Sequence, residues 1–378
     1  MSIFDIHRTN GLVARAVTGH GSTCCVVTFE PLGHSANLDR QAFGQDFLAR
    51  AGIDAVHVVP AANDWYQHAD FPDLCRHVAA FTRRYERVVA YGSSMGGYAA
   101  VRFGGSVGAH QAFALSPQFS IDPRRVPFER RWADAARRLD FTTEAKASRF
   151  VDTAMIAYDP HDPDRHHVDL FRPHTEVVDI ALPYCGHPSS QYLRELGLLQ
   201  QAVLDLAADT FDATALRDLA RARRKEAPAF YVALSRRARS DALALALAER
   251  AIARSSAGLL ALTHFAGPAA RAGRFADAQA ALERAESLQP GHPAVRRAQA
   301  EVHERAGDLD RAIALVEGLC RDPLPIEGDR ARLAHLKLRR RFALYRRLTS
   351  PATLDRLARL LERLHLRRGQ RRPIKGDA

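Results

Sequence analysis

Cysteine is scarce in this chain of 378 residues, and lysine is scarcer still. The five cysteines are scattered, and no two of them stand in a C-x-x-C pair. A small, odd set of this kind excludes a disulfide framework and indicates free thiols in a reducing cytoplasm. With only four lysines, nearly all of the positive charge is carried by arginine.

Long apolar runs are also lacking. No run of about 18 apolar residues is free of charged side chains. The first ten residues have neither a basic start nor an apolar core, so we expect no secretory signal and no membrane-spanning helix. A hydrophobic share of 47% and a charged share of 26% are those of an ordinary folded protein. The length predicts two or three domains.

The net charge of +11 is concentrated at one end of the chain. From Arg332 onward, 15 Lys or Arg residues face three acids, so the rest of the chain is close to neutral. Leucines spaced along 354–364 predict a helix whose apolar face caps the preceding helices. Residues 367–378 are too polar to pack and are predicted to be a basic disordered tail. Contact of this tail with nucleic acid or with an anionic membrane is kept as an alternative.

Residues 1–208 alternate short apolar segments with amphipathic ones. This pattern is typical of an α/β domain with a mostly parallel sheet and helices on both of its faces. Strands are predicted at 25–29, 55–59, 88–91, 111–115, 153–158 and 176–182. Helices are predicted at 43–51, 72–84, from 97 onward, and at 190–205.

The segment 116–150 is longer than a plain connection between two strands needs to be. It is rich in arginine, which leaves two interpretations open: a cap over a site, or an ordinary crossover whose arginines are solvated. The arginines concerned are Arg124, Arg125, Arg130, Arg131, Arg137 and Arg138.

After residue 210 the strand pattern stops and a repeat begins. Residues 272–278 (AGRFADA) match residues 306–312 (AGDLDRA) at an offset of 34. A glycine at this point ends one helix before the next begins, and small residues let paired helices approach closely. A period of 34 residues resembles the tetratricopeptide repeat. We therefore predict a helical-repeat domain over 209–366 that serves a protein partner or self-association.

A G-x-S-x-G motif carries the strongest chemical signal in the chain. Gly92, Ser94 and Gly96 follow the apolar segment 88–91 and precede a stretch of helix-forming residues. In a nucleophile elbow, the serine stands on a tight turn between strand and helix, and the glycines allow close approach of the neighbouring backbone. The alternative is a glycine-rich turn between strand and helix in a doubly wound domain, which either binds phosphate or has no function.

A base and an acid must accompany such a serine. The acidic loop 159–164 follows one predicted strand, and His187 follows the next, so all of these groups are expected at the same edge of the sheet. Residues 20 to about 205 resemble the α/β-hydrolase superfamily. This resemblance implies that Ser94 is the nucleophile and His187 is the base.

The resemblance leaves three carboxylates open as the acid. Asp162 fits the usual position a few residues beyond the strand end and is preferred. Asp159 stands immediately at the strand end and is the second choice. Asp164 is the third, because it is also a candidate for the N-cap of the following helix.

The resemblance also implies an oxyanion hole. The backbone N–H of Met95 would supply one donor, and the loop after the strand 25–29 would supply the other. Pro31 in that loop has no N–H to give, which leaves Leu32 or Glu30. The aromatic pair at 65 and 66 either lines a substrate pocket or packs in the core.

These features predict a serine hydrolase, most simply a carboxylic ester hydrolase acting on a small or acylated substrate through an acyl-enzyme. Two alternatives stay open: an acyltransferase with a sugar or alcohol acceptor, and a non-catalytic scaffold that binds partners through its repeats. Neither a cofactor nor a metal is expected. His161, His166 and His167 are interpreted as loop residues rather than as metal ligands.

Overall fold

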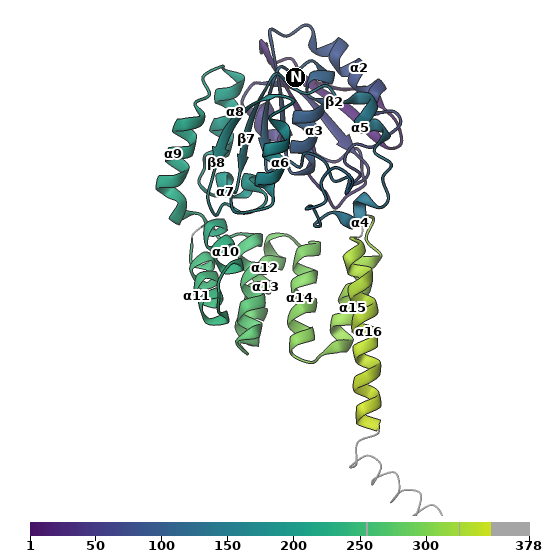
Figure 1. Ribbon diagram of the computed structural model, residues 1–378, viewed down its shortest axis with the longest axis vertical. Helices are drawn as coiled ribbons and strands as arrows, with labels where there is room; N and C mark the ends of the chain where they lie inside the picture. Colours follow the sequence, from purple (N-terminus) through teal and green to yellow (C-terminus); the bar gives the residue numbers. More distant parts are fainter. Residues whose placement is uncertain (255, 325, 349–378) are drawn as a thin grey trace, which may run out of the picture.

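The computed structural model describes residues 1–254, 256–324 and 326–348. Within these residues an α/β domain is followed by a row of helices (Figure 1). The predicted capping helix at 354–364 and the predicted tail at 367–378 lie outside the described residues. No helix in the described part of the chain is both long enough and apolar enough to cross a membrane.

The α/β domain is built on one sheet of eight strands in the order β1-β2-β4-β3-β5-β6-β7-β8. The strands from β4 to β8 in this order are parallel, and only the pairs β1–β2 and β2–β4 are antiparallel. The predicted mostly parallel sheet is thus confirmed. The strands are β1 (Ser2–Arg8), β2 (Leu12–Thr18), β3 (Cys24–Phe29), β4 (Asp54–Pro60), β5 (Arg87–Ser93), β6 (Gln111–Leu115), β7 (Thr153–Tyr158) and β8 (Glu176–Ala181).

The hairpin β1–β2 was not predicted from the sequence. The side chains of β1 are mostly exposed, so this strand carries little apolar signal. In β2 the charge of Arg15 interrupts an otherwise apolar run, although this side chain is buried. Arg15 forms ion pairs with Asp5 (3.3 Å) and Asp39 (3.1 Å), which offset the cost of burying its charge.

Helices cover both faces of the sheet, as predicted. Alternate residues of each strand point to opposite faces, so Val27 belongs to one hydrophobic core and Val26 to the other. The first core also holds residues of α2 (Phe71–Thr82), α3 (Met95–Phe103) and α6 (Asp164–Phe171). The second core holds residues of α1 (Gln45–Arg50), α7 (Ser189–Glu195) and α8 (Leu199–Ala207).

The second core does not end at residue 208, where the sequence placed a domain boundary. Helix α9 (Ala213–Arg223) packs against β8, and Leu216 and Ala220 of this helix are buried in the same core. The Tyr192 hydroxyl donates a hydrogen bond to the Ala220 carbonyl (2.8 Å). Helix α9 therefore contributes to the helical cover of the sheet.

The helical array that follows consists, in the described chain, of three antiparallel pairs and a single last helix, α16. Gly273 and Gly307 stand at matching turns with φ of 75° and 83°, a conformation that favours glycine. The offset of 34 residues thus corresponds to one helix pair. The helices are α10 (Pro228–Arg236), α11 (Asp241–Ile252), α12 (Leu259–Arg271), α13 (Phe275–Leu288), α14 (Pro293–Arg305), α15 (Leu309–Cys320) and α16 (Glu327–Leu348).

The array runs along the edge of the sheet at which the parallel strands end (Figure 1). At its beginning, Arg237 contacts Asp162 in the loop after β7. Farther along, the ring of His292 lies 4.9 Å from the ring of His34, in the loop after β3. At its end, α16 approaches α4 (Ala133–Ala136) of the α/β domain. The array thus touches three separate points of this edge.

Candidate active site

Ser94 stands on a strained turn between β5 and α3. Its φ of 53° and ψ of −115° are rare for a residue with a side chain. A Cβ on Gly92 would lie 2.2 Å from the Gly96 carbonyl oxygen, and one on Gly96 would lie 2.1 Å from the Phe29 carbonyl oxygen. Both motif glycines are therefore required by close backbone packing. The tightly packed turn holds the Ser94 hydroxyl at the end of β5.

Two hydrogen bonds connect Ser94, His187 and Asp164. Ser94 Oγ lies 2.9 Å from His187 Nε2, and His187 Nδ1 lies 2.8 Å from Asp164 Oδ2. Because a carboxylate only accepts, Nδ1 carries the proton, and Nε2 of the neutral ring is free to accept from the serine hydroxyl. The three side chains thus form one hydrogen-bonded chain from hydroxyl to imidazole to carboxylate.

The carboxylate in contact with His187 is not the one preferred from the sequence. Asp164 is the first residue of α6 and is fully buried, with Pro163 rather than Asp164 at the N-cap. Its second oxygen forms an ion pair with Arg131 Nη2 (2.8 Å). Burial alone would raise the pKa of Asp164, but His187 and Arg131 outweigh it and hold that pKa well below its usual range. Asp164 therefore stays ionised beside the histidine.

The preferred candidate, Asp162, points to the repeat array instead. Its Oδ1 accepts a hydrogen bond from Arg237 Nη2 over 2.6 Å. Burial raises the pKa of Asp162, although the neighbouring arginine works in the opposite direction. The sequence favoured Asp162 because of its spacing from the end of β7. In the structure α6 begins at Asp164, and the carboxylate of this residue contacts His187.

Asp159, the second candidate, links the loop that carries Asp164 to the loop that carries His187. Its Oδ2 accepts from the backbone N–H of Gly186 (3.0 Å), and its Oδ1 accepts from those of Tyr184 (3.1 Å) and His161 (3.0 Å). The side chain is fully buried. Asp159 thus fixes the backbone immediately before His187 without touching the imidazole.

The predicted oxyanion donors lie close together in the fold. Met95 is the first residue of α3, so its N–H has no partner within the helix. The close approach of Phe29 to Gly96 brings the loop after β3 past the start of α3. In the described chain neither the Met95 N–H nor the Leu32 N–H donates a hydrogen bond. The neighbouring Glu30 carbonyl accepts from the Tyr66 hydroxyl (2.9 Å).

A buried polar network supports Asp164 from behind. Arg131 donates to both oxygens of Glu129, and His167 Nε2 lies 2.9 Å from Glu129 Oε2. Because His167 Nδ1 accepts from the Phe119 N–H (3.1 Å), its Nε2 carries the proton and donates to Glu129. Burial raises the pKa of Glu129, but the hydrogen bonds from His167 and Arg131 outweigh it and lower that pKa to about 2.

The segment 116–150 brings groups to the site that the sequence did not reveal. The ring of Trp132 lies 6.1 Å from that of His187 and 5.4 Å from that of Trp65. Gln118 is buried; its Nε2 lies 3.4 Å from Ser94 Oγ, and its Oε1 accepts from Trp65 Nε1 (3.3 Å). The Trp132 ring therefore adjoins the histidine, the Gln118 amide adjoins the serine, and Trp65 contacts both Trp132 and Gln118.

The arginines of this segment do not act as one group. Neither a cap over the site nor a crossover with solvated arginines describes all of them. Arg131 reaches Asp164, and Arg125 forms an ion pair with the buried Glu144. Arg124 is exposed and pairs with the buried Asp122. No periodic pattern marks Trp132 or Gln118, because the segment holds only the short helices α4 and α5 (Thr142–Ala147).

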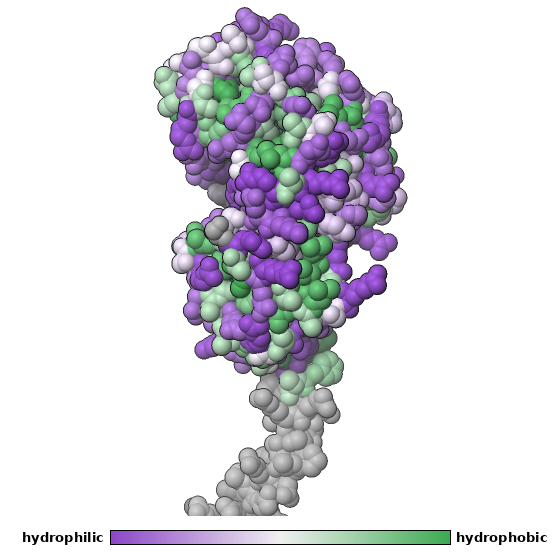
Figure 2. Space-filling view, turned by 90° about the vertical axis from the view of Figure 1, so that its left-hand side faces the viewer, coloured by the Kyte–Doolittle hydropathy of each residue, from purple (hydrophilic) through white to green (hydrophobic). Residues whose placement is uncertain are grey.

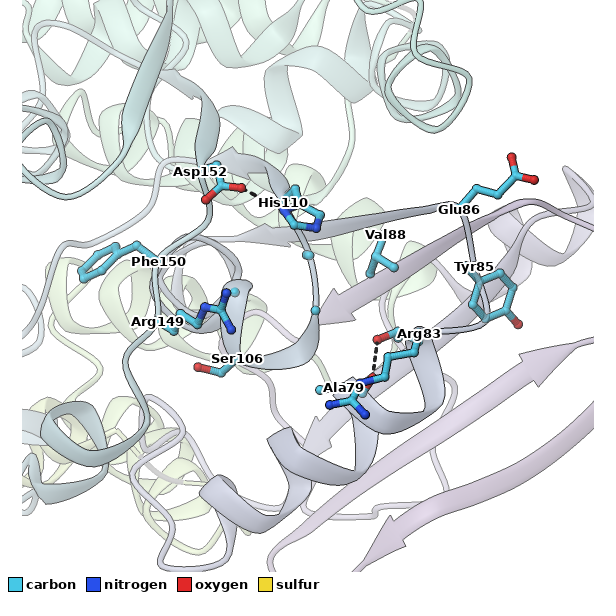
Figure 3. A pocket seen from close by; sticks show the side chains of 14 residues that line it. Ala79, Arg83, Tyr85, Glu86, Val88, Ser106, His110, Arg149, Phe150 and Asp152 are labelled. Carbon is cyan, nitrogen blue, oxygen red and sulfur yellow. Dashed lines mark hydrogen bonds and ion pairs between the residues drawn. The ribbon is translucent and has the colours of Figure 1, made fainter.

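A pocket of about 400 Å³ lies at the opposite edge of the sheet (Figure 3). Val88 at the start of β5 and His110 just before β6 line it, together with Arg83, Arg149 and Asp152. Ser94 follows the other end of β5. This pocket is therefore separate from the serine and the histidine.

Comparisons with known proteins agree with the repeat pattern. Residues 269–321 match the family model of the tetratricopeptide repeat. A search of curated proteins finds no match.

Three solved structures are similar at low identity. Yeast Tom70 is 20% identical over 44% of this chain, with a TM-score of 0.28, and the chain spans only 36% of Tom70. A serine hydrolase without a lid from Xanthomonas campestris is 14% identical over 58% of this chain and 93% of its own (TM-score 0.33). An esterase from Pyrococcus furiosus is 13% identical over 47% and 81% (TM-score 0.31).

The strand order and the repeat match give the architecture. The parallel sheet with helices on both faces holds the serine turn at its carboxyl edge. The helix pairs after it include the segment that matches the repeat model. The chain combines an α/β domain on a mostly parallel eight-stranded sheet with a helical array, of which residues 269–321 match the tetratricopeptide-repeat model.

Proposed function

We propose that this protein is a serine hydrolase that cleaves carboxylic esters through an acyl-enzyme on Ser94. The observation that carries the proposal is the pair of hydrogen bonds from Ser94 Oγ to His187 Nε2 and from His187 Nδ1 to Asp164, on a serine held in a strained turn. Strain of this kind persists where the surrounding structure enforces it, and it clusters at functional sites.

The reaction begins when the Ser94 hydroxyl attacks the ester carbonyl and His187 Nε2 takes the hydroxyl proton. The imidazolium that forms is stabilised by Asp164, which stays ionised because Arg131 and the histidine hold its pKa low. His187 then gives the proton to the departing alkoxide, which leaves as an alcohol. Water attacks the acyl-enzyme in the second half, with the same proton transfers in reverse order.

The negative charge on the carbonyl oxygen needs donors that are already in place. In this proposal the Met95 N–H at the start of α3 is one donor, and the Leu32 N–H is the other. The absence of a hydrogen-bond partner for either N–H within the described residues supports these roles. Trp132, whose ring adjoins His187, would contact the acyl or the alcohol part of the ester.

The repeat array is proposed to bind a protein partner. Its contacts with the loops after β3 and β7 would place that partner beside the catalytic edge.

A fluorophosphonate probe tests the proposal, because it labels only an activated serine. The full chain should be labelled, and Ser94→Ala should abolish the labelling. Ser93→Ala is the matched control: Ser93 Oγ contacts Ser190 Oγ (2.9 Å) and not His187, so its labelling should persist. Labelling that survives in Ser94→Ala would refute the assignment. Turnover of an acyl ester with and without an added alcohol then separates hydrolysis from acyl transfer.

A further inference from the structure

A second cavity lies behind the loop that carries His187. It has a volume of about 570 Å³ and opens between β8, α9 and the start of α10. Leu182 and Tyr184 of the loop after β8 form one wall, and Tyr192 and Phe230 form another. A volume of several hundred Å³ with mainly apolar and aromatic walls is typical of a small-molecule site.

The aromatic walls are held in place by neighbouring groups. The ring of Tyr184 stacks on His161 at 4.5 Å and meets Phe230 edge-on at 6.2 Å. The Tyr192 hydroxyl already donates to the Ala220 carbonyl, so it offers its ring rather than a free donor. Neighbouring groups therefore hold the aromatic rings of this wall, and these rings offer the cavity an apolar surface.

Three arginines supply all of the charge that lines this cavity. Arg217 and Arg221 lie one turn apart on α9, and Arg224 follows at the end of that helix. In the described chain the Arg221 guanidinium has no hydrogen-bond or ion-pair partner. Arg224 donates only to the Arg221 carbonyl (2.7 Å). No Asp or Glu lines the cavity.

This arrangement selects for one kind of ligand. An apolar body fits the aromatic walls, while guanidinium groups without an acidic partner attract a carboxylate or a phosphate and bind it with two parallel hydrogen bonds. Figure 2 faces the side of the molecule on which α9 lies and shows a hydrophilic band where the two parts meet, with hydrophobic residues beside it. We infer that this cavity binds a small amphiphilic anion, with its head on Arg221 and Arg224.

The inferred site is distinct from the proposed catalytic site. Ser94 and His187 do not line the cavity. Tyr184 stands three residues before His187 in the same loop, so the ligand would lie next to the catalytic loop without reaching the serine. The inference therefore does not require that Ser94 be a nucleophile.

Calorimetric titration of the full chain with three ligands of equal chain length tests the inference. Decanoate and decyl phosphate carry the anionic head, and decan-1-ol lacks it. We expect decan-1-ol to bind at least about tenfold more weakly than the better anion, because it makes no charge-assisted hydrogen bond. The stronger of the two anions then tells whether the site fits a carboxylate or a phosphate ester. Equal binding of decan-1-ol would show that the cavity is only an apolar groove and would overturn the inference.

Substitutions on α9 locate the binding. Arg221→Gln and Arg224→Gln should each weaken binding of the anion by about tenfold. Arg223→Gln is the matched control, because Arg223 pairs with Glu226 and does not line the cavity. Ser94→Ala should bind the anion as the unchanged chain does. Loss of binding in Ser94→Ala, or unchanged binding in both Arg221→Gln and Arg224→Gln, would place the ligand elsewhere and refute the site.

Discussion

Arg237 lies directly after α10, the first helix of the array, and its Nη2 donates to Asp162 Oδ1 over 2.6 Å. Asp162 stands two residues before Asp164, the carboxylate in contact with His187. The same Arg237 nitrogen lies 3.4 Å from Asp159, which fixes the backbone before His187. One side chain of the array therefore contacts two carboxylates of the loop after β7, and through Asp159 it is linked to the backbone before His187.

We predict that Arg237 is a positioning residue for the proposed hydrolysis. Arg237→Met leaves Asp159 and Asp162 without their shared cation, so the two loops should shift relative to each other. Small displacements of catalytic groups can lower rates by up to about 100-fold, and we expect about a tenfold loss in the rate of probe labelling. Arg237→Lys should restore most of the rate. Arg239→Gln is the control, because Arg239 is exposed. A Met variant that is labelled as fast as the unchanged chain would contradict the prediction.

We predict that Asp164, and not Asp162, orients His187. Asp164→Asn removes the acceptor that fixes the Nδ1–H tautomer and should lower the turnover of an ester by about 10³-fold or more. Asp162→Asn should cost no more than about tenfold, because an amide oxygen still accepts from Arg237. Steady-state kinetics of the two variants measure the difference. The opposite ranking would return the role to the residue that the sequence favoured.

Asp162 and Asp164 show which part of the site the sequence can predict and which part it cannot. The turn at Ser94 and the position of His187 follow from local patterns, since Ser94 comes directly after β5 and His187 lies in the loop after β8, and apolar runs predict both strands. The choice among three carboxylates in one loop is not local. It depends on Arg131, which holds Asp164, and on Arg237, which draws Asp162 away. Neither arginine lies near the loop in the sequence.

The elements missed in the fold have a similar cause. Strand β1 is exposed, and β2 contains a buried charge that is offset only by tertiary ion pairs. Trp132 and Gln118 come from a segment with little regular structure, so no periodicity could place them beside the site. The sequence did predict the repeats, because their helix pairs recur with the same glycine turn.

The buried network behind Asp164 predicts a dependence of stability on pH. The folded pKa of Glu129 is about 2, below the ordinary value of 4.5. A group with a lowered folded pKa stabilises the fold above its unfolded pKa, and this contribution is lost as the pH falls through the folded value. The contribution is of the order of 3 kcal/mol, and its loss should begin below about pH 5.

Urea unfolding at several pH values between about 6 and 3 measures this loss. Glu129→Gln should be less stable near neutral pH and should lose less stability on acidification than the unchanged chain. Glu176→Gln is the control, because Glu176 is exposed on β8. Parallel pH profiles of the unchanged chain and Glu129→Gln would contradict the prediction.

Truncation tests where the α/β domain ends. The sequence pattern placed the boundary at residue 208, so a fragment 1–210 would be expected to stay soluble. In the structure that cut removes α9, which buries Leu216 and Ala220 against the sheet and accepts the hydrogen bond from Tyr192. Exposed core surface of this kind promotes aggregation. We therefore expect fragment 1–210 to precipitate and fragment 1–226, which keeps α9 but lacks Phe230 and Tyr231 of the same core, to be the more soluble of the two.

Fragment 1–226 also separates two roles, because it keeps α9, which packs against the sheet, and lacks Arg237, which contacts Asp159 and Asp162. It lacks Arg237, so it should be labelled by the fluorophosphonate probe at the reduced rate of the Arg237→Met chain and not at the full rate. Solubility on expression and the labelling rate are measured on the same preparations. A soluble fragment 1–210 that is labelled at the full rate would show that neither α9 nor Arg237 is needed, and that the boundary does lie near residue 208.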